Sequence, residues 1–246
     1  MPRFYLPPAA WDPARLILTG AEAHHCLDVM RMKAGDRATV FDGQGNVAEV
    51  EILSGRRGEV ECRVLDTIAA PPPACRITLA QAIPKGKNME FVIEKATELG
   101  VSAIVPLLTA RTVVQLDAGD AARKREKWQR IALEAAKQCG QNWLPEVAPP
   151  QTPAAFFEKT PAFDLMLIGS LEPDARLLKG LLAEKGPGKI SSALVLIGPE
   201  GDFTPAEMAS AKEYGCRPIT FGPIILRTET AAIYSLSVLS HELLGG

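Results

Sequence analysis

Two glycine-proline turns in the C-terminal third of the chain carry the residues best suited to chemistry. The turn GPEG at 198–201 ends the apolar run LVLI, and the turn GP at 222–223 ends the run PITF. Neither has the G-x-G-x-x-G spacing or the G-K-[ST] lysine that holds a phosphate, and Glu200 would repel one. The first turn therefore predicts either a plain connection or a site where backbone groups hold a neutral or cationic ligand.

The second turn leads to a charged sequence, LRTET at 226–230, at the start of a predicted helix. Arg227 stands just before the helix N-terminus, where the helix dipole disfavours a cation. We therefore expect Arg227 to have an anionic partner. Glu229 or Glu200 supplies it in a purely structural interpretation, and a substrate group supplies it in a functional one.

Capping residues define the helices that follow these turns. Thr204 and Glu207 form a capping box, with proline at the first helical position. Thr228 is predicted to cap the last helix, at 228–244. That helix is apolar almost all round, which predicts burial against the core or against a second subunit.

The turns belong to a region in which strands and helices alternate, which predicts a parallel α/β sheet. Short apolar runs suit buried parallel strands. The helical pattern at 88–99 is followed by Gly100, which is a natural C-cap. The expected strands are 76–83, 103–108, 164–170, 193–198 and 218–221, and the expected helices include 88–99, 120–139 and 228–244.

Before this region the chain is rich in β-strand patterns. Residues 47–53 and 59–65 alternate apolar and polar side chains and are joined by the turn GRRG at 55–58. A short helix is expected at 21–32. The run AAPPPA at 69–74 marks a joint, because three prolines cannot continue a helix or a ladder.

Composition limits the classes of function. The chain has 246 residues, a net charge of -2 and a pI near 6.0, so a nucleic-acid partner would need local basic patches. Five scattered cysteines, without a C-x-x-C pair or a Cys/His cluster, suggest neither disulfides nor a metal site. Without an apolar leader or membrane-length run, we expect a cytoplasmic protein.

Several motifs in order resemble one family. They are PRFY (2–5), HHCLDVMRMKAGD (24–36), KGKNMEFVIEKATELGV (85–101), AR (110–111), WQRIALEAAKQCGQN (128–142), IGPEGDFTPAE (197–207) and FGPIILRTETAA (221–232). Together they resemble the SPOUT-class RNA methyltransferases, and more narrowly the bacterial family that methylates N3 of uridine 1498 in 16S ribosomal RNA.

The resemblance implies an N-terminal PUA-like β-barrel (1–70) that binds RNA and a SPOUT methyltransferase domain (75–246). It implies a parallel α/β sheet with a trefoil knot at about 193–244. It further implies S-adenosylmethionine (SAM) as cofactor, a homodimer with the site near the interface, and 16S rRNA within the 30S subunit as substrate; no metal is expected, since the residues offer no ligand cluster.

By the same resemblance, the two turns form the SAM pocket. The implied cofactor-binding residues are Leu171, Leu196, Ile197, Gly198, Pro199, Glu200, Gly201, Phe221, Gly222, Pro223, Leu226, Thr228, Thr230 and Ala231. The chain departs from the family pattern at Asp202, Ile224 and Gln141, where the family usually has glycine, a basic residue and arginine.

Methylation of uracil N3 requires that its proton leave, so the site needs a base or a group that stabilises the imide anion. We expect Arg227 to stabilise that anion or an adjacent phosphate, with Glu229, Glu200 or water as the base. Candidate RNA contacts are Arg3, Arg31, Lys33, Lys85, Lys87 and Arg111. For Arg56 and Arg57 a solvated turn is the better interpretation.

Other polar residues have plainer interpretations. His24 and His25 are expected to pack or cap, since no third metal ligand is near. Glu94, Lys95 and Glu98 are spaced for ion pairs on one helix. Gln138 and Asn142 are placed where they could reach the site or a dimer partner.

Two other functions compete with methyl transfer. The first is a nucleotide-dependent α/β enzyme, but the dinucleotide-binding fingerprint that such an enzyme carries is missing from this sequence. A non-catalytic, ribosome-associated RNA-binding protein would not need the intact turn motifs. SAM binding separates these alternatives.

Overall fold

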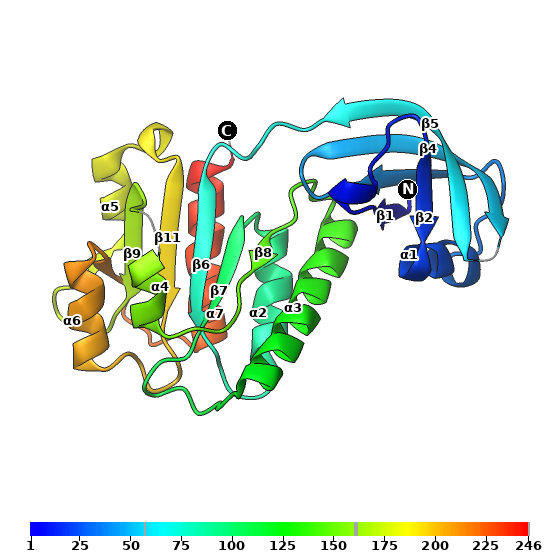
Figure 1. Ribbon diagram of the computed structural model, residues 1–246. Helices are drawn as coiled ribbons and strands as arrows, with labels where there is room; N and C mark the ends of the chain where they lie inside the picture. The colour runs from blue at the N-terminus through cyan, green and yellow to red at the C-terminus, as the bar shows by residue number, and fades with distance from the viewer. Residues whose placement is uncertain (57, 160–161, 246) are drawn as a thin grey trace. The chain divides into compact units, whose positions relative to one another are not determined.

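The computed structural model describes residues 1–56, 58–159 and 162–245 and divides the chain into two compact units (Figure 1). The N-terminal unit comprises Met1–Pro72 and Leu133–Leu144, and the C-terminal unit comprises Pro73–Ala132 and Pro145–Gly246. The division falls in the predicted proline-rich joint. The assignment of residues 133–144 to the first unit is one that the sequence pattern did not indicate.

The N-terminal unit is built on a five-stranded sheet in the order β1-β3-β4-β5-β2, which leaves β1 and β2 at its edges as a half-barrel. β1 pairs with β3 in parallel, and the other pairs are antiparallel. The strands are β1 (Arg3–Tyr5), β2 (Leu16–Thr19), β3 (Arg37–Phe41), β4 (Asn46–Arg56) and β5 (Glu59–Ala69), with the helices η1 (Pro8–Ala10), α1 (Gly20–His24) and η2 (His25–Val29).

The predicted alternation along β4 is confirmed. Ala48, Val50 and Ile52 are buried in the core of this unit, while Glu49 and Glu51 remain partly exposed. A period of two places these two sets on opposite faces of the strand.

The segment 133–144 joins this unit through buried polar contacts. The ammonium of Lys137, whose side chain is 6 % exposed, lies 2.9 Å from Glu22 Oε1. The guanidinium of Arg3 donates to Asn142 Oδ1 at 2.8 Å and to the Gln141 carbonyl at 3.2 Å. Because a buried charge is costly without a partner, these pairs fix the segment against the half-barrel.

The C-terminal unit contains a seven-stranded sheet in the order β10-β12-β9-β11-β6-β7-β8, and every pair in it is parallel. This confirms the predicted parallel α/β sheet. The strands are β6 (Arg76–Ala82), β7 (Ala103–Leu107), β8 (Glu146–Val147), β9 (Leu165–Gly169), β10 (Arg176–Leu177), β11 (Ser192–Ile197) and β12 (Arg217–Thr220).

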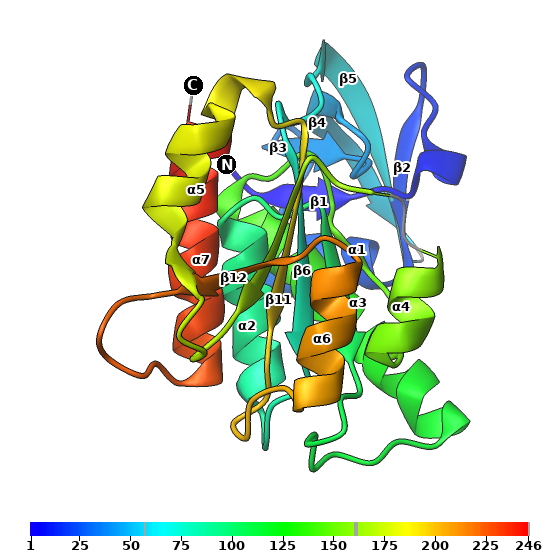
Figure 2. The same cartoon turned by 90° about the vertical axis from the view of Figure 1, so that its left-hand side faces the viewer.

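Helices cover both faces of this sheet. Figure 2 shows α2, α5 and α7 on one face and α4 and α6 on the other. The helices are α2 (Asn88–Glu98), α3 (Ala118–Cys139), α4 (Pro153–Lys159), α5 (Leu178–Lys185), η3 (Pro187–Lys189), α6 (Pro205–Glu213) and α7 (Thr228–Leu243). The residues of α3 from position 133 onward belong to the N-terminal unit.

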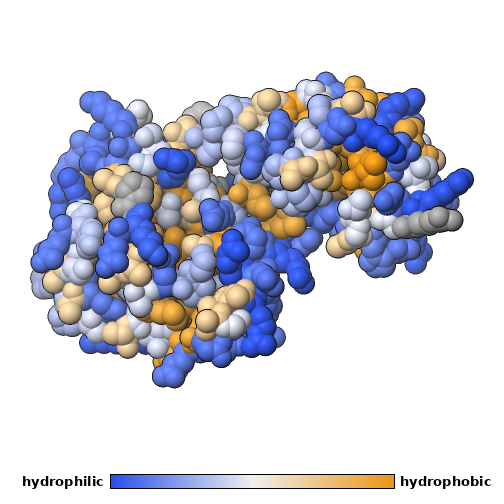
Figure 3. Space-filling model, in the orientation of Figure 1, coloured by the Kyte–Doolittle hydropathy of each residue, from blue (hydrophilic) through white to orange (hydrophobic). Residues whose placement is uncertain are grey.

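Surface and helix composition are ordinary for a globular chain. Hydrophilic and apolar residues are interspersed over the face seen in Figure 3. Within the described ranges, no helix combines the length and apolarity that a membrane crossing requires.

Two of the predicted helix ends are confirmed. Thr204 and Glu207 form a reciprocal capping box at the start of α6. Gly100 has φ +80°, and the N–H groups of Gly100 and Val101 donate back to Thr97 and Ala96. This is the glycine-terminated helix end that closes α2.

The predicted cap of the last helix is wrong. Arg227 occupies the N-cap position without a side-chain capping bond, and Thr228 is the first helical residue. The Thr228 hydroxyl is instead bonded to another part of the unit, as described below. The trefoil knot implied for 193–244 stays a prediction.

Candidate functional site

A cavity of about 400 Å³ lies where β9, β11 and β12 end. Parallel strands bring their carboxyl ends to the same edge of the sheet, where open α/β sheets bind ligands. Its lining residues come from the last residues of these strands, from the segments that follow them and from the first residues of α2 and α7: Asn88, Gly169, Ser170, Leu171, Ile197, Gly198, Pro199, Glu200, Asp202, Thr220, Phe221, Gly222, Ile224, Ile225, Leu226, Arg227, Thr228, Glu229 and Ala231.

The shape of both turns depends on unusual backbone conformations. Gly222 has φ +114°, which side-chain-bearing residues rarely adopt, and it lets the chain turn away directly after β12. Asp202 has φ +61° and its carboxylate accepts a hydrogen bond from the N–H of Phe203. The position therefore suits glycine, and aspartate, whose short polar side chain bonds locally, replaces it.

A buried chain of hydrogen bonds joins the two turns. The Thr228 hydroxyl donates to the Gly198 carbonyl at 2.6 Å and accepts from Gln81 Nε2 at 3.0 Å. Gln81 is fully buried on β6, next to Ile197 in register, and Nε2 also donates to the Ala82 carbonyl at 2.9 Å. The start of α7 is thus fixed to the end of β11 through one hydroxyl.

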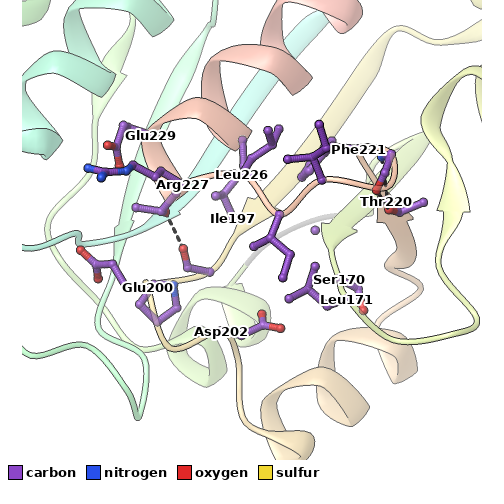
Figure 4. Close-up of a pocket in the computed structure, with 18 of the residues that line it drawn as sticks. Ser170, Leu171, Ile197, Glu200, Asp202, Thr220, Phe221, Leu226, Arg227 and Glu229 are labelled. Carbon is purple, nitrogen blue, oxygen red and sulfur yellow. Dashed lines mark hydrogen bonds between the residues drawn. The ribbon is translucent and has the colours of Figure 1, made fainter.

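Charged side chains gather toward one end of the cavity. In Figure 4, Arg227, Glu229 and Glu200 lie toward one end, and Thr220 and Phe221 lie toward the other. Neither the Arg227 guanidinium nor the Glu229 carboxylate has a hydrogen-bond or ion-pair partner in the part of the chain that the structure describes. The structural interpretation of Arg227, which required Glu229 or Glu200 as its partner, is therefore wrong.

The first turn is held from outside by two neighbouring segments. Glu200 Oε1 accepts a hydrogen bond from the backbone N–H of Lys85 at 2.9 Å. Arg111 Nη1 donates to the Gly201 carbonyl at 2.6 Å and lies 3.4 Å from the Phe203 carbonyl. Glu200 is thus partly committed to the loop that precedes α2, and Arg111 stabilises the turn.

Most of the residues implied for cofactor binding line this one cavity. They are Leu171, Ile197, Gly198, Pro199, Glu200, Phe221, Gly222, Leu226, Thr228 and Ala231. Four others do not line it: Leu196, Gly201, Pro223 and Thr230. Leu196 is 1 % exposed and packs in the core of the unit, because alternate residues of a strand point to opposite faces.

The structure adds lining residues that sequence reasoning missed as cofactor contacts. Gly169, Ser170 and Thr220 end or follow predicted strands, so the rule that ligands collect at carboxyl ends would have found them. Asn88 is distant in sequence, and no local pattern marked it. Ile224, noted only as a departure from the family pattern, is 74 % exposed at the cavity rim.

The candidate RNA contacts fall into two groups. Arg3 and Arg111 are engaged within the fold, and burial lowers the pKa of the Arg3 guanidinium. The side chains of Arg31, Lys33, Lys85 and Lys87 are exposed and unpaired among the described residues. The second group is the one available to phosphates.

The remaining polar residues have structural partners. His24 lies 2.7 Å from Asp28, and His25 packs edge-on against Phe4. Lys95 pairs with Glu98, three residues on, at 2.7 Å, as the helical spacing predicted, and also with its neighbour Glu94 at 2.7 Å.

Gln138 lies in the last turn of α3, and Asn142 follows that helix. Asn142 accepts the bond from Arg3, and Gln138 is exposed. Arg57 lies outside the described residues. No group of three or more His, Cys, Asp or Glu side chains in the described ranges is arranged to hold a metal ion.

Comparison with known proteins gives consistent matches over nearly the whole chain. A family model described as an RNA methyltransferase domain matches residues 71–240, and one described as an RNA methyltransferase PUA domain matches residues 18–65. The chain is 36 % identical to ribosomal RNA small subunit methyltransferase E of Bacillus subtilis (strain 168), over 92 % of this chain and 89 % of that protein.

Solved structures give the same match. Ribosomal RNA small subunit methyltransferase E from Neisseria gonorrhoeae bound to S-adenosyl methionine has a TM-score of 0.85 at 30 % identity, covering 97 % of this chain and 96 % of that one. A putative methyltransferase from Legionella pneumophila in complex with SAM has a TM-score of 0.86 at 33 % identity, covering 96 % of each chain.

Proposed function

The chain belongs to the RNA methyltransferase family, and on that premise we propose that it transfers the SAM methyl group to N3 of uridine 1498 in 16S ribosomal RNA. The observation that carries the proposal is the cavity at the strand ends, where Arg227 has no partner among the described residues. The proposed substrate is the assembled 30S subunit, so the activity would be cytoplasmic.

The residues present fit SAM. The cavity lies within the usual range of ligand-site volumes. Leu171, Ile197 and Leu226 offer apolar surface, and the carboxylates of Glu200 and Asp202 suit a cationic ligand. When bound, SAM supplies an electrophilic methyl group on a sulfonium sulfur.

The chain's own part in the reaction is to position the uracil and stabilise the charge that develops on it. Loss of the N3 proton leaves an imide anion with charge on O2 and O4. The guanidinium of Arg227, which has no partner in the described part of the chain, is available to that anion. A donor placed where charge develops contributes strongly to rate. The N-terminal ends of α2 and α7 border the same cavity, through Asn88 and Thr228, and their dipoles favour an anion too.

Two carboxylates are candidates for accepting the N3 proton. Glu229 has no partner among the described residues, whereas one oxygen of Glu200 holds the Lys85 N–H. Glu229 is therefore the better candidate for the base, with a water molecule as its competitor. Glu200 serves mainly to hold the first turn in place.

We also propose that the active form is a homodimer. Ile224 and Ile225 are each 74 % exposed and Leu171 is 64 % exposed, all at the rim of the cavity. Burial of these side chains against a second subunit would remove apolar surface from water and close the site. We propose as well that residues 193–244 form the trefoil knot that the family resemblance implies.

The experiment is methylation of 30S subunits with labelled SAM, followed by mapping of the modified base. We expect one N3-methyluridine, at the position equivalent to 1498. Methylation of another rRNA base would retain the enzyme class and refute the specificity. Failure to bind SAM in calorimetry would refute methyl transfer and favour a non-catalytic RNA-binding role.

A further inference from the structure

The described residues that line the cavity carry more negative than positive charge. The charged ones are three carboxylates and one guanidinium, from Glu200, Asp202, Glu229 and Arg227. In Figure 4, Asp202 lies apart from the end of the cavity where the other three gather. The dipole of α7 acts within the first turn of that helix, which begins beside Arg227, and so offsets little of the charge at Asp202.

The turn needs the side-chain oxygen of Asp202 but does not need its charge. Asp202 has φ +61°, and Oδ1 accepts a hydrogen bond from the Phe203 N–H at 2.8 Å. The Asp202 N–H donates to the Pro199 carbonyl at 2.9 Å. Asparagine also adopts this left-handed conformation and offers the same side-chain acceptor. The local structure therefore leaves the negative charge of Asp202 without a structural role.

The second carboxylate oxygen of Asp202 has no hydrogen-bond or ion-pair partner in the described part of the chain. The other two carboxylates of the lining are placed differently. One oxygen of Glu200 accepts a backbone N–H from the loop before α2, and Glu229 shares its end of the cavity with Arg227. Asp202 thus presents a half-buried negative charge to the cavity, away from the arginine.

We propose that the Asp202 carboxylate makes the cavity favour SAM over S-adenosylhomocysteine, the molecule left after methyl transfer, and this rests on the proposed function. In the transfer the S–C bond breaks, both of its electrons stay on sulfur, and the sulfonium becomes a neutral thioether. Uracil N3 forms the new bond with the electron pair freed by loss of its proton. The two molecules therefore differ by one positive charge, and a nearby carboxylate stabilises the charged one.

The test is calorimetry of the full-length protein with SAM and with S-adenosylhomocysteine, which gives the ratio of their dissociation constants. In Asp202→Asn the preference for SAM should fall about fivefold, because this variant removes the charge and keeps the acceptor for Phe203. Asp202→Gly should show the same fall, since glycine also adopts the left-handed turn. Added salt should reduce the wild-type preference more than that of Asp202→Asn.

The matched control is Glu213→Gln, which removes an exposed carboxylate of α6 that does not line the cavity. Its ratio should equal that of the wild type, and thermal unfolding checks that every variant is folded. A third ligand, a SAM analogue with a protonated amine in place of the sulfonium, keeps the charge in a different chemical group. Its affinity should fall in Asp202→Asn as that of SAM does.

Three results would overturn the proposal. They are an unchanged ratio in Asp202→Asn, a ratio that shifts only in Glu200→Gln, and an amine analogue whose affinity does not depend on Asp202. In the last case the methyl group would be recognised and the charge would not. A wild-type protein that binds neither SAM nor S-adenosylhomocysteine would refute the proposed function. Binding of SAM with a ratio independent of Asp202 would keep that function and refute only the role of Asp202.

Discussion

The hydroxyl of Thr228 joins the two turns of the cavity, and its removal has a cost that the structure defines. Thr228→Val keeps the shape of the side chain but leaves the Gly198 carbonyl without its donor and Gln81 Nε2 without one acceptor. Each buried polar group left unpaired costs about 1–3 kcal/mol. The added methyl group offsets under about 1 kcal/mol, so we expect a loss of about 3 kcal/mol.

The assay is thermal and urea unfolding of the full-length protein, monitored in the C-terminal unit. For a unit of this size the loss corresponds to a fall of about 6–12 °C in Tm. Thr228→Ser is the matched control, because it keeps the hydroxyl and loses only a methyl group, and its Tm should fall by a quarter of that amount or less.

A double-mutant cycle with Gln81→Leu tests the connection directly. Residues that share a hydrogen bond couple, so the double variant should be less destabilised than the sum of the single variants. The reasoning is refuted if Thr228→Val is as stable as Thr228→Ser, or if the two substitutions are additive.

Four further outcomes follow from the structure. Arg227→Ala should keep its SAM affinity and lose about 10²- to 10³-fold in methylation rate. Arg123→Ala, which removes an exposed arginine of α3, is the control and should methylate at the wild-type rate. An undiminished rate in Arg227→Ala would refute the proposed role of Arg227. Asn88→Ala removes an amide N–H donor from the cavity lining, so we expect methylation to be slower by about 10²-fold; an undiminished rate would show that the Asn88 amide takes no part in the reaction. Lys137→Ala should destabilise the N-terminal unit by about 3 kcal/mol, since it leaves the Glu22 carboxylate without its ion pair and with only the Tyr5 N–H as a donor. Combining Lys137→Ala with Glu22→Gln should recover part of this loss in urea unfolding. Hydrogen bonds from Ser191 and Ser192 lower the pKa of Asp164 in the folded state. Their stabilising effect is therefore present above the unfolded pKa of about 3.9 and is lost as the pH falls through the lower folded value. The difference in free energy of unfolding between wild type and Asp164→Asn should narrow below about pH 4, and a difference independent of pH would contradict this.

The sequence by itself determined the features that depend on local chemistry. The capping box at Thr204 and the terminating glycine at Gly100 both formed as predicted, because each is satisfied by residues within a few positions. The apolar runs became parallel strands for a similar reason, since a run buried on both faces has few alternatives. The two turns could therefore be placed at one edge of the sheet before the structure was known.

Only the tertiary structure decided how distant groups share partners. Thr228 had the right type and position for a cap, yet its hydroxyl is bonded to a carbonyl 30 residues earlier in the chain and to a glutamine on another strand. In the same way Arg227 has no carboxylate partner among the described residues, although its position before a helix predicted one. Hydrogen bonds and charges are satisfied by whichever partner packing brings closest, and sequence spacing does not contain that information.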